Sequence, residues 1–395
     1  MKKYILAVIS ITLLVFFSGC SLIQKKDNTP SNGKDVFSVN AEKGSLWKTS
    51  DGGQTFSVKS KIDEKNSITS ADILSIAYHT KKPGTIYVST VDSGIFKTEN
   101  AGENWASIAF PPKRIYSFIL DKNSPDDRMF ASGVVGGWGK IFRTDDGGNN
   151  WRDIYTEPGQ KTVVTALSQH FRDTNVIFAG TSAGTVVKSV DNGDTWKNTG
   201  NKVDGVAADF TFDASKKLVT YLLILDKKIY YSPDGGVTWL DWEAVKQQEV
   251  KDLQDKAAKA SLARNIEQAK KFQEQAQKLS ERNQINKMPD KIVSMATDPL
   301  RTGIIYAGTS AGLFRSNDYG KYWDEVNIIE SAKKFAIRSI AINPANSMEI
   351  IFVAGRAFYK SVNGGETWSV TGLNADREAW FVSYDPFDAK YLFIG

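Results

Sequence analysis

The chain has 395 residues, of which 41% are hydrophobic and 24% charged, so it is long enough for one large repeat assembly or two to three ordinary domains. The formal charge of +5 is spread among interspersed acids without a basic block that could follow a phosphate backbone, and no nucleic acid partner is expected. The single cysteine excludes disulfide bonds and cysteine-built metal sites.

The N-terminus predicts export and a lipid anchor. Two lysines precede an apolar run from Tyr4 to Phe17, and about 14 residues are too few to span a bilayer, which needs ~20. Small residues before Cys20 resemble a bacterial lipobox, in which that cysteine is lipidated and begins the mature chain, although Phe17 stands where the motif usually has Leu. We expect attachment to the outer face of the plasma membrane or to an outer membrane. Ordinary signal cleavage nearby is the alternative.

The expected domain boundaries follow from shifts in composition. A lipoprotein signal peptide covers residues 1–20, and residues 21–36 are polar without an apolar period, which predicts a flexible tether. The folded body covers residues 37–240 and 289–395, interrupted by an insertion at 241–288.

One short turn recurs along the body, as in SVDNGDTW at 189 and SVNGGETW at 361. Its acid or amide positions are Asp51, Asn100, Asp146, Asp191, Asp234, Asp318 and Asn363, with intervals of 49, 46, 45, 43, 84 and 45 residues. A fixed period of this kind indicates a repeat architecture, and the interval of 84 is one period plus about 40 inserted residues.

Each residue type in the turn has a structural role. The Asp or Asn oxygen can accept backbone N–H groups as in an Asx-turn, and the glycine two residues later suits a positive φ. The aromatic residue five positions after the acid is free to bury against the neighbouring sheet. These aromatic residues are Phe56, Trp105, Trp151, Trp196, Trp239, Trp323 and Trp368.

The pattern S/T-x-D-x-G-x-T-W resembles the Asp box, or BNR repeat, of sialidases, sortilin-type receptors, xyloglucanases and photosystem assembly factors. The resemblance implies a β-propeller, with each box forming the hairpin between the third and fourth strands of a blade, on the side away from the binding face. It covers the repeats from about residue 35 to the end of the chain.

Unpaired repeat halves predict how the ring closes. A pair of strand-like runs precedes six of the turns, and a seventh pair, WFVSYDPFDAKYLFIG, ends the chain with no turn behind it. The first turn, in GSLWKTSDGGQTF, has no pair before it. We therefore expect an all-β, seven-bladed β-propeller whose last blade combines strands from both chain ends, which removes exposed sheet edges.

The insertion at 241–288 lacks Gly and Pro and is rich in Ala, Gln, Lys and Glu, which predicts helix. Both ends must return to adjacent blades, and the apolar phase restarts between Ala260 and Asn265, so we expect an α-helical hairpin that bends there. We expect it to join the outer strand of one blade to the inner strand of the next, on the face opposite the turns. It either contacts a macromolecule or is a solvated decoration.

No catalytic residue, metal site or cofactor is predicted. Sialidases bind a carboxylate with three arginines, one in an FRIP-like motif that PPKRIYSF around Arg114 lacks, and the related xyloglucanases place two carboxylates between tandem propellers. His79 and His170 occupy equivalent places just after an inner strand, so both are expected to be turn residues on the side of the recurring turns.

A basic rim is the remaining candidate site. Its residues lie at the starts of inner strands, which should bring them to one edge: Arg114, Lys161, Lys291, Arg338 and Arg377, with Lys113, Lys333 and Lys334 nearby. Photosystem assembly factors carry an Arg-rich patch on one propeller face. The interleaved acids Asp204, Asp290, Asp376 and Glu378 would neutralise the rim and make it an ordinary solvated edge.

Two functions are expected from this organisation. The first is a non-catalytic, membrane-anchored scaffold or assembly factor that binds a protein partner through the upper propeller face and the helical hairpin. The second is a glycan-binding or sialidase-like hydrolytic propeller, with Trp138 in the loop GVVGGWGK as the candidate for stacking on a sugar and a carboxylate pair about 5 to 9.5 Å apart.

Overall fold

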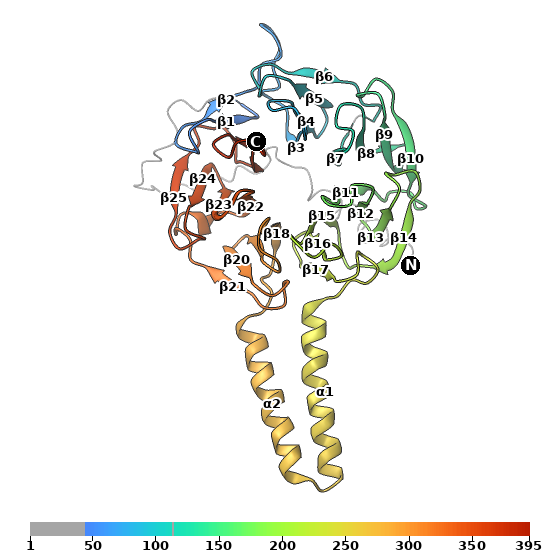
Figure 1. Ribbon diagram of the computed structural model, residues 1–395, viewed down its shortest axis with the longest axis vertical. Coiled ribbons are helices and arrows are strands. Elements are labelled where there is room, and N and C mark those ends of the chain that lie inside the picture. The colour runs from blue at the N-terminus through green and yellow to red at the C-terminus, as the bar shows by residue number, and fades with distance from the viewer. Residues whose placement is uncertain (1–43, 113) are drawn as a thin grey trace, which may run out of the picture. The chain divides into compact units, whose positions relative to one another are not determined.

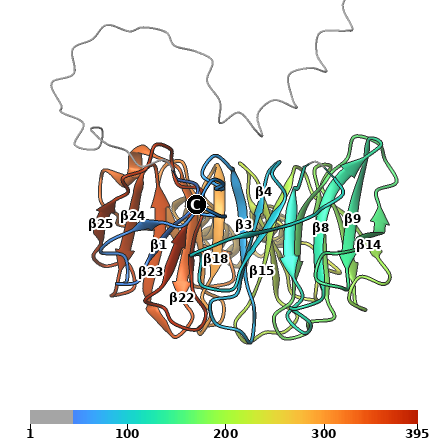
Figure 2. The same ribbon diagram turned by 90° about the horizontal axis from the view of Figure 1, so that it is seen from above.

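The computed structural model describes residues 44–112 and 114–395, and among them 27 strands form seven antiparallel sheets arranged in a ring (Figure 1). Each sheet is one blade, and successive blades follow the chain, with the first strand of a blade nearest the ring axis and the last at the rim. Figure 2 shows that the strands run between the same two faces of the ring. The predicted seven-bladed β-propeller is confirmed.

The strands group into blades as follows. Blade 1 is β3 (Ile73–Tyr78), β4 (Ile86–Thr90), β5 (Ile95–Thr98) and β6 (Ala106–Ile108); blade 2 is β7 (Ser117–Leu120), β8 (Met129–Val135), β9 (Trp138–Thr144) and β10 (Arg152–Thr156). Blade 3 is β11 (Val164–Gln169), β12 (Ile177–Thr181), β13 (Thr185–Ser189) and β14 (Lys197–Lys202); blade 4 is β15 (Ala207–Phe212), β16 (Thr220–Ile224) and β17 (Ile229–Ser232). Blade 5 is β18 (Ile292–Thr297), β19 (Ile305–Thr309), β20 (Leu313–Ser316) and β21 (Asp324–Val326); blade 6 is β22 (Ile337–Asn343), β23 (Asn346–Ala354), β24 (Ala357–Ser361) and β25 (Ser369–Gly372). A 3₁₀ turn, η1 (Ala332–Lys334), precedes blade 6.

Blade 7 joins the two ends of the described chain. Its order is β2 (Ser57–Val58), β1 (Trp47–Thr49), β27 (Leu392–Ile394) and β26 (Val382–Tyr384). β1 pairs antiparallel with β27, with Trp47 opposite Ile394 and Lys48 opposite Phe393. This is the predicted composite blade, and it leaves each blade with a neighbour on both sides.

The core lies between neighbouring blades. Every residue of the second strands β4, β12, β16 and β19 is buried, because adjacent blades cover both faces of each sheet. A short, continuous run of apolar and β-branched residues such as those in IYVST suits a strand with no solvated face. Folding of one blade is therefore coupled to packing against the next.

The recurring turn uses one hydrogen-bond pattern, which blade 3 illustrates. Ser189 Oγ donates to Asp191 Oδ1 (2.7 Å) and accepts from the Gly193 amide (2.8 Å), while Asp191 Oδ1 also accepts from the Thr195 amide (2.9 Å). Gly193 has a φ of +82°, and a Cβ there would lie 2.9 Å from Phe130 of the preceding blade. The turn therefore combines local hydrogen bonds with a close approach that only glycine allows.

The aromatic residues of the turns are less buried than expected. Trp105 and Trp323 are buried, whereas Phe56, Trp151, Trp196, Trp239 and Trp368 are half-buried. The Trp105 indole N–H donates to Lys59 O and the Trp151 indole N–H donates to Ala109 O (2.8 Å each), in the connections that precede their own blades. These two rings therefore lie at the seam between two blades.

The insertion is a pair of antiparallel helices, α1 (Trp242–Leu262) and α2 (Ile266–Ile285), and the bend falls within the predicted interval. Asp241 caps α1 by accepting from the Glu243 amide, and Asn265 caps α2 by accepting from the Gln268 amide. The helices approach closely through small buried side chains, which are Ala257, Ala269 and Ala276.

The predicted position of the hairpin is wrong. Blade 4 has three strands among the described residues, and where a fourth strand would run only Leu240 forms a bridge, to Tyr231, before Asp241 caps α1. The base of the hairpin instead contacts the recurring turn of blade 5: Trp242 Nε1 donates to Tyr319 O (2.9 Å) and Lys321 pairs with Glu249 (2.8 Å). The hairpin thus replaces an outer strand at the rim, on the side of the turns.

Candidate binding surface

We define the upper face as the face formed by the turns between the second and third strands of each blade and by the connections between blades. The recurring turns lie on the opposite face, because they join third to fourth strands. The predicted rim residues do lie on the upper side, but they belong to five blades: Arg114 and Trp138 to blade 2, Lys161 to blade 3, Lys291 to blade 5, Arg338 to blade 6 and Arg377 to blade 7. They do not form one contiguous site.

Several rim charges are paired. Arg377 binds Asp72 (3.0 Å) and Thr69 O (3.1 Å), so its guanidinium links blade 7 to the start of blade 1. The interleaved acid Asp204 pairs with Lys227 (2.8 Å), and Asp290 with Lys287 (3.5 Å). Arg377 is therefore paired, whereas Asp204 and Asp290 pair with lysines outside the predicted rim and do not neutralise its cations.

The other rim residues have separate surroundings. Lys161 and Lys291 are exposed, and no ion pair joins either of them to another residue in 44–112 or 114–395. The Arg114 guanidinium lies 5.8 Å from the centre of the Tyr116 ring. Trp138 was expected in a loop, but it is the first residue of β9, half-buried and opposite Val135, because a two-residue Gly-Gly turn already joins the strands. Lys113 lies outside the described residues.

An arginine stacked on a tryptophan stands out on the upper face, where blade 6 meets blade 7, and Phe335 is packed nearby over Gly355. We call Phe335, Arg338, Glu378 and Trp380 the Trp380 cluster. The Arg338 guanidinium lies 4.0 Å from the centre of the Trp380 ring and also binds Glu378 (3.2 Å). The Trp380 side chain is nevertheless 54% exposed and Phe335 is 42% exposed. The contact is a stacked cation–π pair with an accessible aromatic surface beside it.

The backbone holds this cluster in place. The Trp380 amide donates to the Gly395 carbonyl (2.6 Å), and the Ala379 amide to the Gly355 carbonyl (2.9 Å). Phe335 lies over Gly355, where a Cβ would come within 2.9 Å of the ring and φ is +59°. The aromatic residues are therefore positioned by ordered chain on both sides rather than by a free loop.

Sequence analysis missed the Trp380 cluster, although a signal was present. Phe335 and Trp380 each stand two residues before the first residue of an inner strand, β22 and β26. In the other blades that place holds Ala71, Ile115, Thr162, Gly205 or Asp290. An alignment of the repeats on the inner strands would have shown two aromatic residues at a position that is otherwise small, aliphatic or polar.

A second repeated feature was also missed in part. A buried polar residue ends or directly follows each inner strand, and these residues are His79, Asp121, His170, Asp213, Asp298, Asn343 and Asp385. The expectation that His79 and His170 are turn residues is confirmed, since His79 Nδ1 accepts from the Lys81 and Lys82 amides and His170 Nδ1 from the Arg172 and Asp173 amides. The carboxylates do the same work in other blades, where Asp213 accepts from Ser215 and Lys216.

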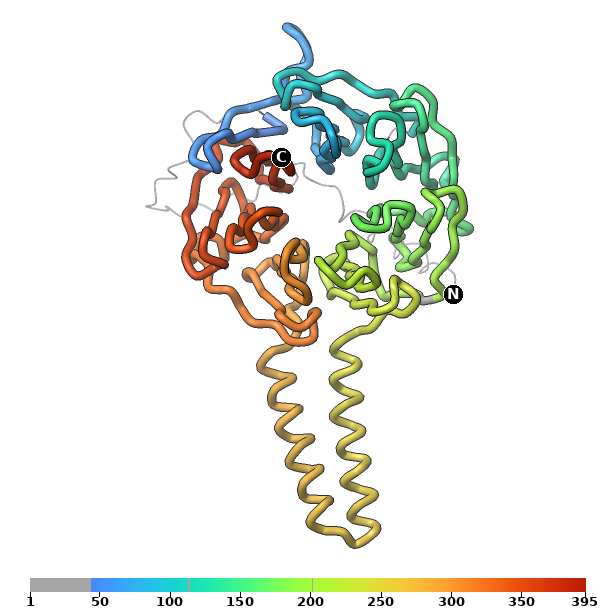
Figure 3. The backbone as a smooth tube through the Cα atoms, in the orientation of Figure 1, coloured from blue at the N-terminus to red at the C-terminus, as the bar shows by residue number. Residues whose placement is uncertain are grey.

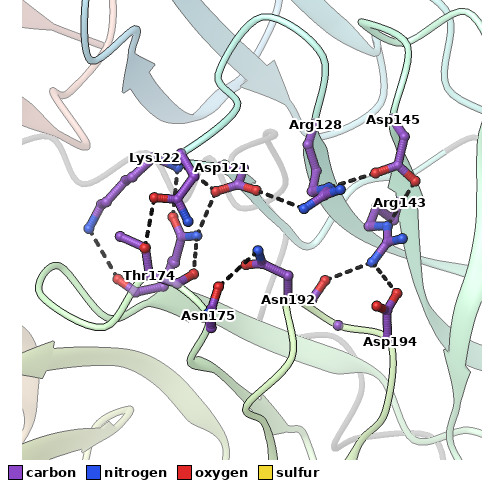
Figure 4. A network of polar contacts seen from close by, with 12 residues as sticks. Asp121, Lys122, Arg128, Arg143, Asp145, Thr174, Asn175, Asn192 and Asp194 are labelled. Atoms are coloured by element: carbon purple, nitrogen blue, oxygen red, sulfur yellow. Dashed lines mark hydrogen bonds and ion pairs between the residues drawn. The ribbon is translucent and has the colours of Figure 1, made fainter.

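These residues also connect blades, as Figure 4 shows for blades 2 and 3. Gln169 Nε2 donates to Asp121 Oδ1 (2.8 Å), and the Lys122 ammonium donates to Gln169 O (3.1 Å). Beside them, Arg128 binds Asp145 (2.6 Å) and Arg143 reaches Asp194 in the next blade (2.7 Å). The face that carries the recurring turns is thus occupied by contacts that hold the ring together.

Asp209 is a carboxyl group with an unusual environment. It lies on β15, the innermost strand of blade 4, and its nearest hydroxyl is Ser168 Oγ of blade 3 (3.4 Å). Burial among the inner strands raises the pKa of Asp209 to about 7, against the Phe210 amide and the Ser168 hydroxyl, which favour the charged form. The Asp209 side chain is nevertheless exposed to solvent, which weakens this rise in its pKa.

Metal sites and membrane-spanning helices are two further features that bear on function. Within 44–112 and 114–395, no group of three or more His, Cys, Asp or Glu side chains is placed to hold a metal ion. In the same part of the chain, no helix combines the length and the apolar character needed to cross a membrane.

The fold and the upper-face cluster define this chain as a seven-bladed β-propeller. No protein-family model matches it. In sequence it is similar to a xyloglucanase of Hypocrea jecorina (strain QM6a), with 27% identity over 142 residues, which are 36% of this chain and 15% of that protein. The chain therefore spans a small part of this curated relative.

Among the solved structures that share this fold are GH74 enzymes and YCF48. The GH74 xyloglucanase of Xanthomonas campestris superposes with a TM-score of 0.59 and 16% identity, over 82% of this chain and 50% of that one. YCF48 of Cyanidioschyzon merolae gives a TM-score of 0.53 and 14% identity, over 82% of this chain and 94% of that one. A structure of YCF48 bound to D1 peptide gives 0.55 and 12%, over 82% and 93%. At these identities the likeness establishes the fold alone.

Asp209 gives a pH-dependent prediction. Its pKa is raised in the folded state, so between the ordinary carboxyl range and pH 7 the folded chain keeps a proton that the unfolded chain loses. This group therefore lowers stability as pH rises. We expect Asp209→Asn to raise the melting temperature at pH 8 and to leave it nearly unchanged at pH 4, measured by calorimetry. Asp204→Asn, a control whose carboxylate is held by Lys227, should give no gain. Equal effects of Asp209→Asn at both pH values would contradict the assignment.

Proposed function

We propose that this chain is a non-catalytic binding protein that contacts a protein partner through the Trp380 cluster on the upper face. The observation that carries the proposal is an exposed tryptophan stacked on an arginine, with an exposed phenylalanine packed over Gly355, whose carbonyl binds the adjacent Ala379 amide. Trp and Arg are enriched among the residues that dominate the binding energy of protein interfaces, and the contact with the Trp380 ring already restrains the Arg338 side chain. The opposite face is occupied by contacts between blades.

The charges around the cluster favour binding over hydrolysis. Glu378 is neutralised by Arg338, and Asp72 by Arg377, so these two carboxylates are committed to ion pairs. A glycosidase needs one carboxyl group that holds a proton and one that is free to act as base or nucleophile. The YCF48 structure bound to D1 peptide supports the proposal by showing that a propeller of this fold binds a peptide.

Membrane attachment belongs to the same proposal but rests on sequence. Cys20 and the segments at 1–20 and 21–36 lie outside the described residues, so the lipid anchor and the envelope location stay predictions. The role of the Trp380 cluster does not depend on them. The correction to the hairpin position does matter, because the hairpin leaves the rim on the side of the turns and is not part of the upper face.

Photocrosslinking in the native cell tests the contact. A photoreactive phenylalanine analogue in place of Phe335 in the full chain should give an adduct with one protein, and Trp380→Ala in the same chain should weaken that interaction about 30-fold, as for other interface hot spots. The matched control carries the analogue at Val362, which is 62% exposed on the recurring turn of the same blade. Equal adducts from both positions, or an adduct insensitive to Trp380→Ala, would overturn the proposal.

Glycan binding is the second candidate, and the exposed Trp380 ring is the observation that favours it, together with the similarity to xyloglucanases. Aromatic faces stack on sugars as readily as on protein side chains. Calorimetric titration with a xyloglucan oligosaccharide separates the two functions: binding that is lost in Trp380→Ala supports the glycan function, and the absence of heat in the unmodified chain excludes it. Release of reducing sugar would further indicate a hydrolase.

A further inference from the structure

The end of the helical hairpin carries exposed apolar side chains. Leu262 closes α1 and Ile266 opens α2, and their side chains are 85% and 69% exposed. They lie on either side of the bend, at the point of the hairpin farthest from the ring (Figure 3). Two branched aliphatic residues at the tip of a projection are costly in water, which indicates a surface that is covered in use.

Basic side chains surround these two residues. We define the hairpin tip as residues 256–271. It contains five basic side chains and one acid, and all six are exposed: Lys256, Lys259, Arg264, Lys270, Lys271 and Glu267. No ion pair links these side chains to other residues within the described part of the chain. The tip is therefore strongly positive and its charges are available.

The rest of the hairpin carries more acidic than basic side chains. Residues 242–255 and 272–285 contain six acids, which are Glu243, Glu249, Asp252, Asp255, Glu274 and Glu281, and four bases, which are Lys246, Lys251, Lys278 and Arg282. Some of these charges hold the base in place: Lys246 pairs with Glu243 (2.6 Å) and Glu249 with Lys321 of blade 5 (2.8 Å). The positive charge is thus concentrated at the far end rather than spread along the helices.

The hairpin holds its tip away from the propeller. α1 has 21 residues, so it is about 30 Å long. At the base, Tyr322 OH donates to Asn283 Oδ1 (3.1 Å) and the Arg282 guanidinium lies 4.1 Å from the centre of the Tyr322 ring. At the bend the backbone is satisfied, since the Ala263 amide donates to Lys259 O (3.1 Å) and the Asn265 amide to Ala260 O (2.9 Å). The tip is a supported, well-capped end rather than a frayed loop.

We propose that the hairpin tip docks end-on to an anionic phospholipid surface. At 1.5 Å per helical residue, Lys259, Lys256 and Lys270 stand about 4.5, 9 and 6 Å behind the apolar pair. That offset matches the ~5–10 Å by which peripheral segments bury apolar side chains at the boundary of headgroups and acyl chains. Leu262 and Ile266 would enter that boundary while the lysines reach the phosphates.

The shape and charge of the tip favour a lipid surface over other occupants. The tip is convex and its basic side chains surround the apolar pair on both helices, so a flat, deformable, negatively charged surface can satisfy all of them together. A protein partner would need a groove with acids on both sides, and a nucleic acid offers no apolar layer for Leu262 and Ile266. The inference rests on the hairpin alone and is independent of the Trp380 cluster.

A local probe tests the docking. In the full chain carrying Cys20→Ser, Ser261→Cys is labelled with an environment-sensitive fluorophore and mixed with phosphatidylcholine vesicles, with or without about one third phosphatidylglycerol. We expect a blue shift with the anionic vesicles and little with phosphatidylcholine alone. Lys256→Gln with Lys259→Gln should lower the apparent affinity about 25-fold, from roughly fivefold for each basic residue near an anionic surface. Leu262→Asn with Ile266→Asn should remove the blue shift.

The control isolates the tip from the rest of the hairpin. Lys251→Gln with Lys278→Gln removes the same charge from exposed helical positions nearer the base and should leave the affinity unchanged. All variants share the N-terminal segment, so differences between them report on the hairpin. No spectral change with anionic vesicles, an equal change without phosphatidylglycerol, or an equal loss in tip and control variants would each overturn the proposal.

Discussion

Ring closure is the constraint on which the rest of the structure depends. A blade covers its faces only by packing against its two neighbours, so an open ring would expose two apolar sheet faces and an unpaired edge. The chain meets this constraint by building blade 7 from both ends, with β1 inserted beside β27. Trp47, Leu392 and Ile394 then share one buried cluster with residues of blade 6.

Ring closure also gives the two faces of the propeller different roles. On one face, the recurring turns, the buried acceptors after the inner strands and ion pairs such as Arg143 with Asp194 fasten each blade to the next. The connections on the upper face make fewer contacts between blades, so they can present side chains such as Trp380 to a partner. The hairpin occupies the position of the outer strand of blade 4. That strand can be replaced because it is farthest from the ring axis.

Sequence was sufficient wherever the fold repeats. The seven turns fixed the blade count and the register, and the unmatched halves at Trp47 and Leu392 fixed the closure, because periodicity constrains every copy at once. The bend of the hairpin was predicted from the change in phase of its apolar residues. Single, non-repeated features were harder: the start of the helical insertion at residue 241 was predicted, but not that only Leu240 then remains to pair with Tyr231, so the hairpin takes the place of the outer strand and emerges on the side of the turns.

The candidate site was not predicted from the sequence, although two aromatic residues at one repeat position were a signal for it. The shared repeat position of its residues predicts a basic rim, yet Arg377 is paired with Asp72 across the closure, and Lys161 and Lys291 lie in separate blades. The cluster that does form depends on Arg338 of blade 6 meeting Trp380 of blade 7 across the seam between these blades. Contacts across a seam are a property of the assembled ring.

Hydrogen exchange at the C-terminal strand tests the closure most directly. In the full chain, the amides of β27 should exchange as slowly as those of the buried strand β4, and Trp47→Ala, far away in sequence, should accelerate exchange at 392–394. Trp196→Ala, which alters the turn of blade 3, should leave β27 protected. If Trp47→Ala leaves exchange in β27 unchanged, the two chain ends do not share a blade.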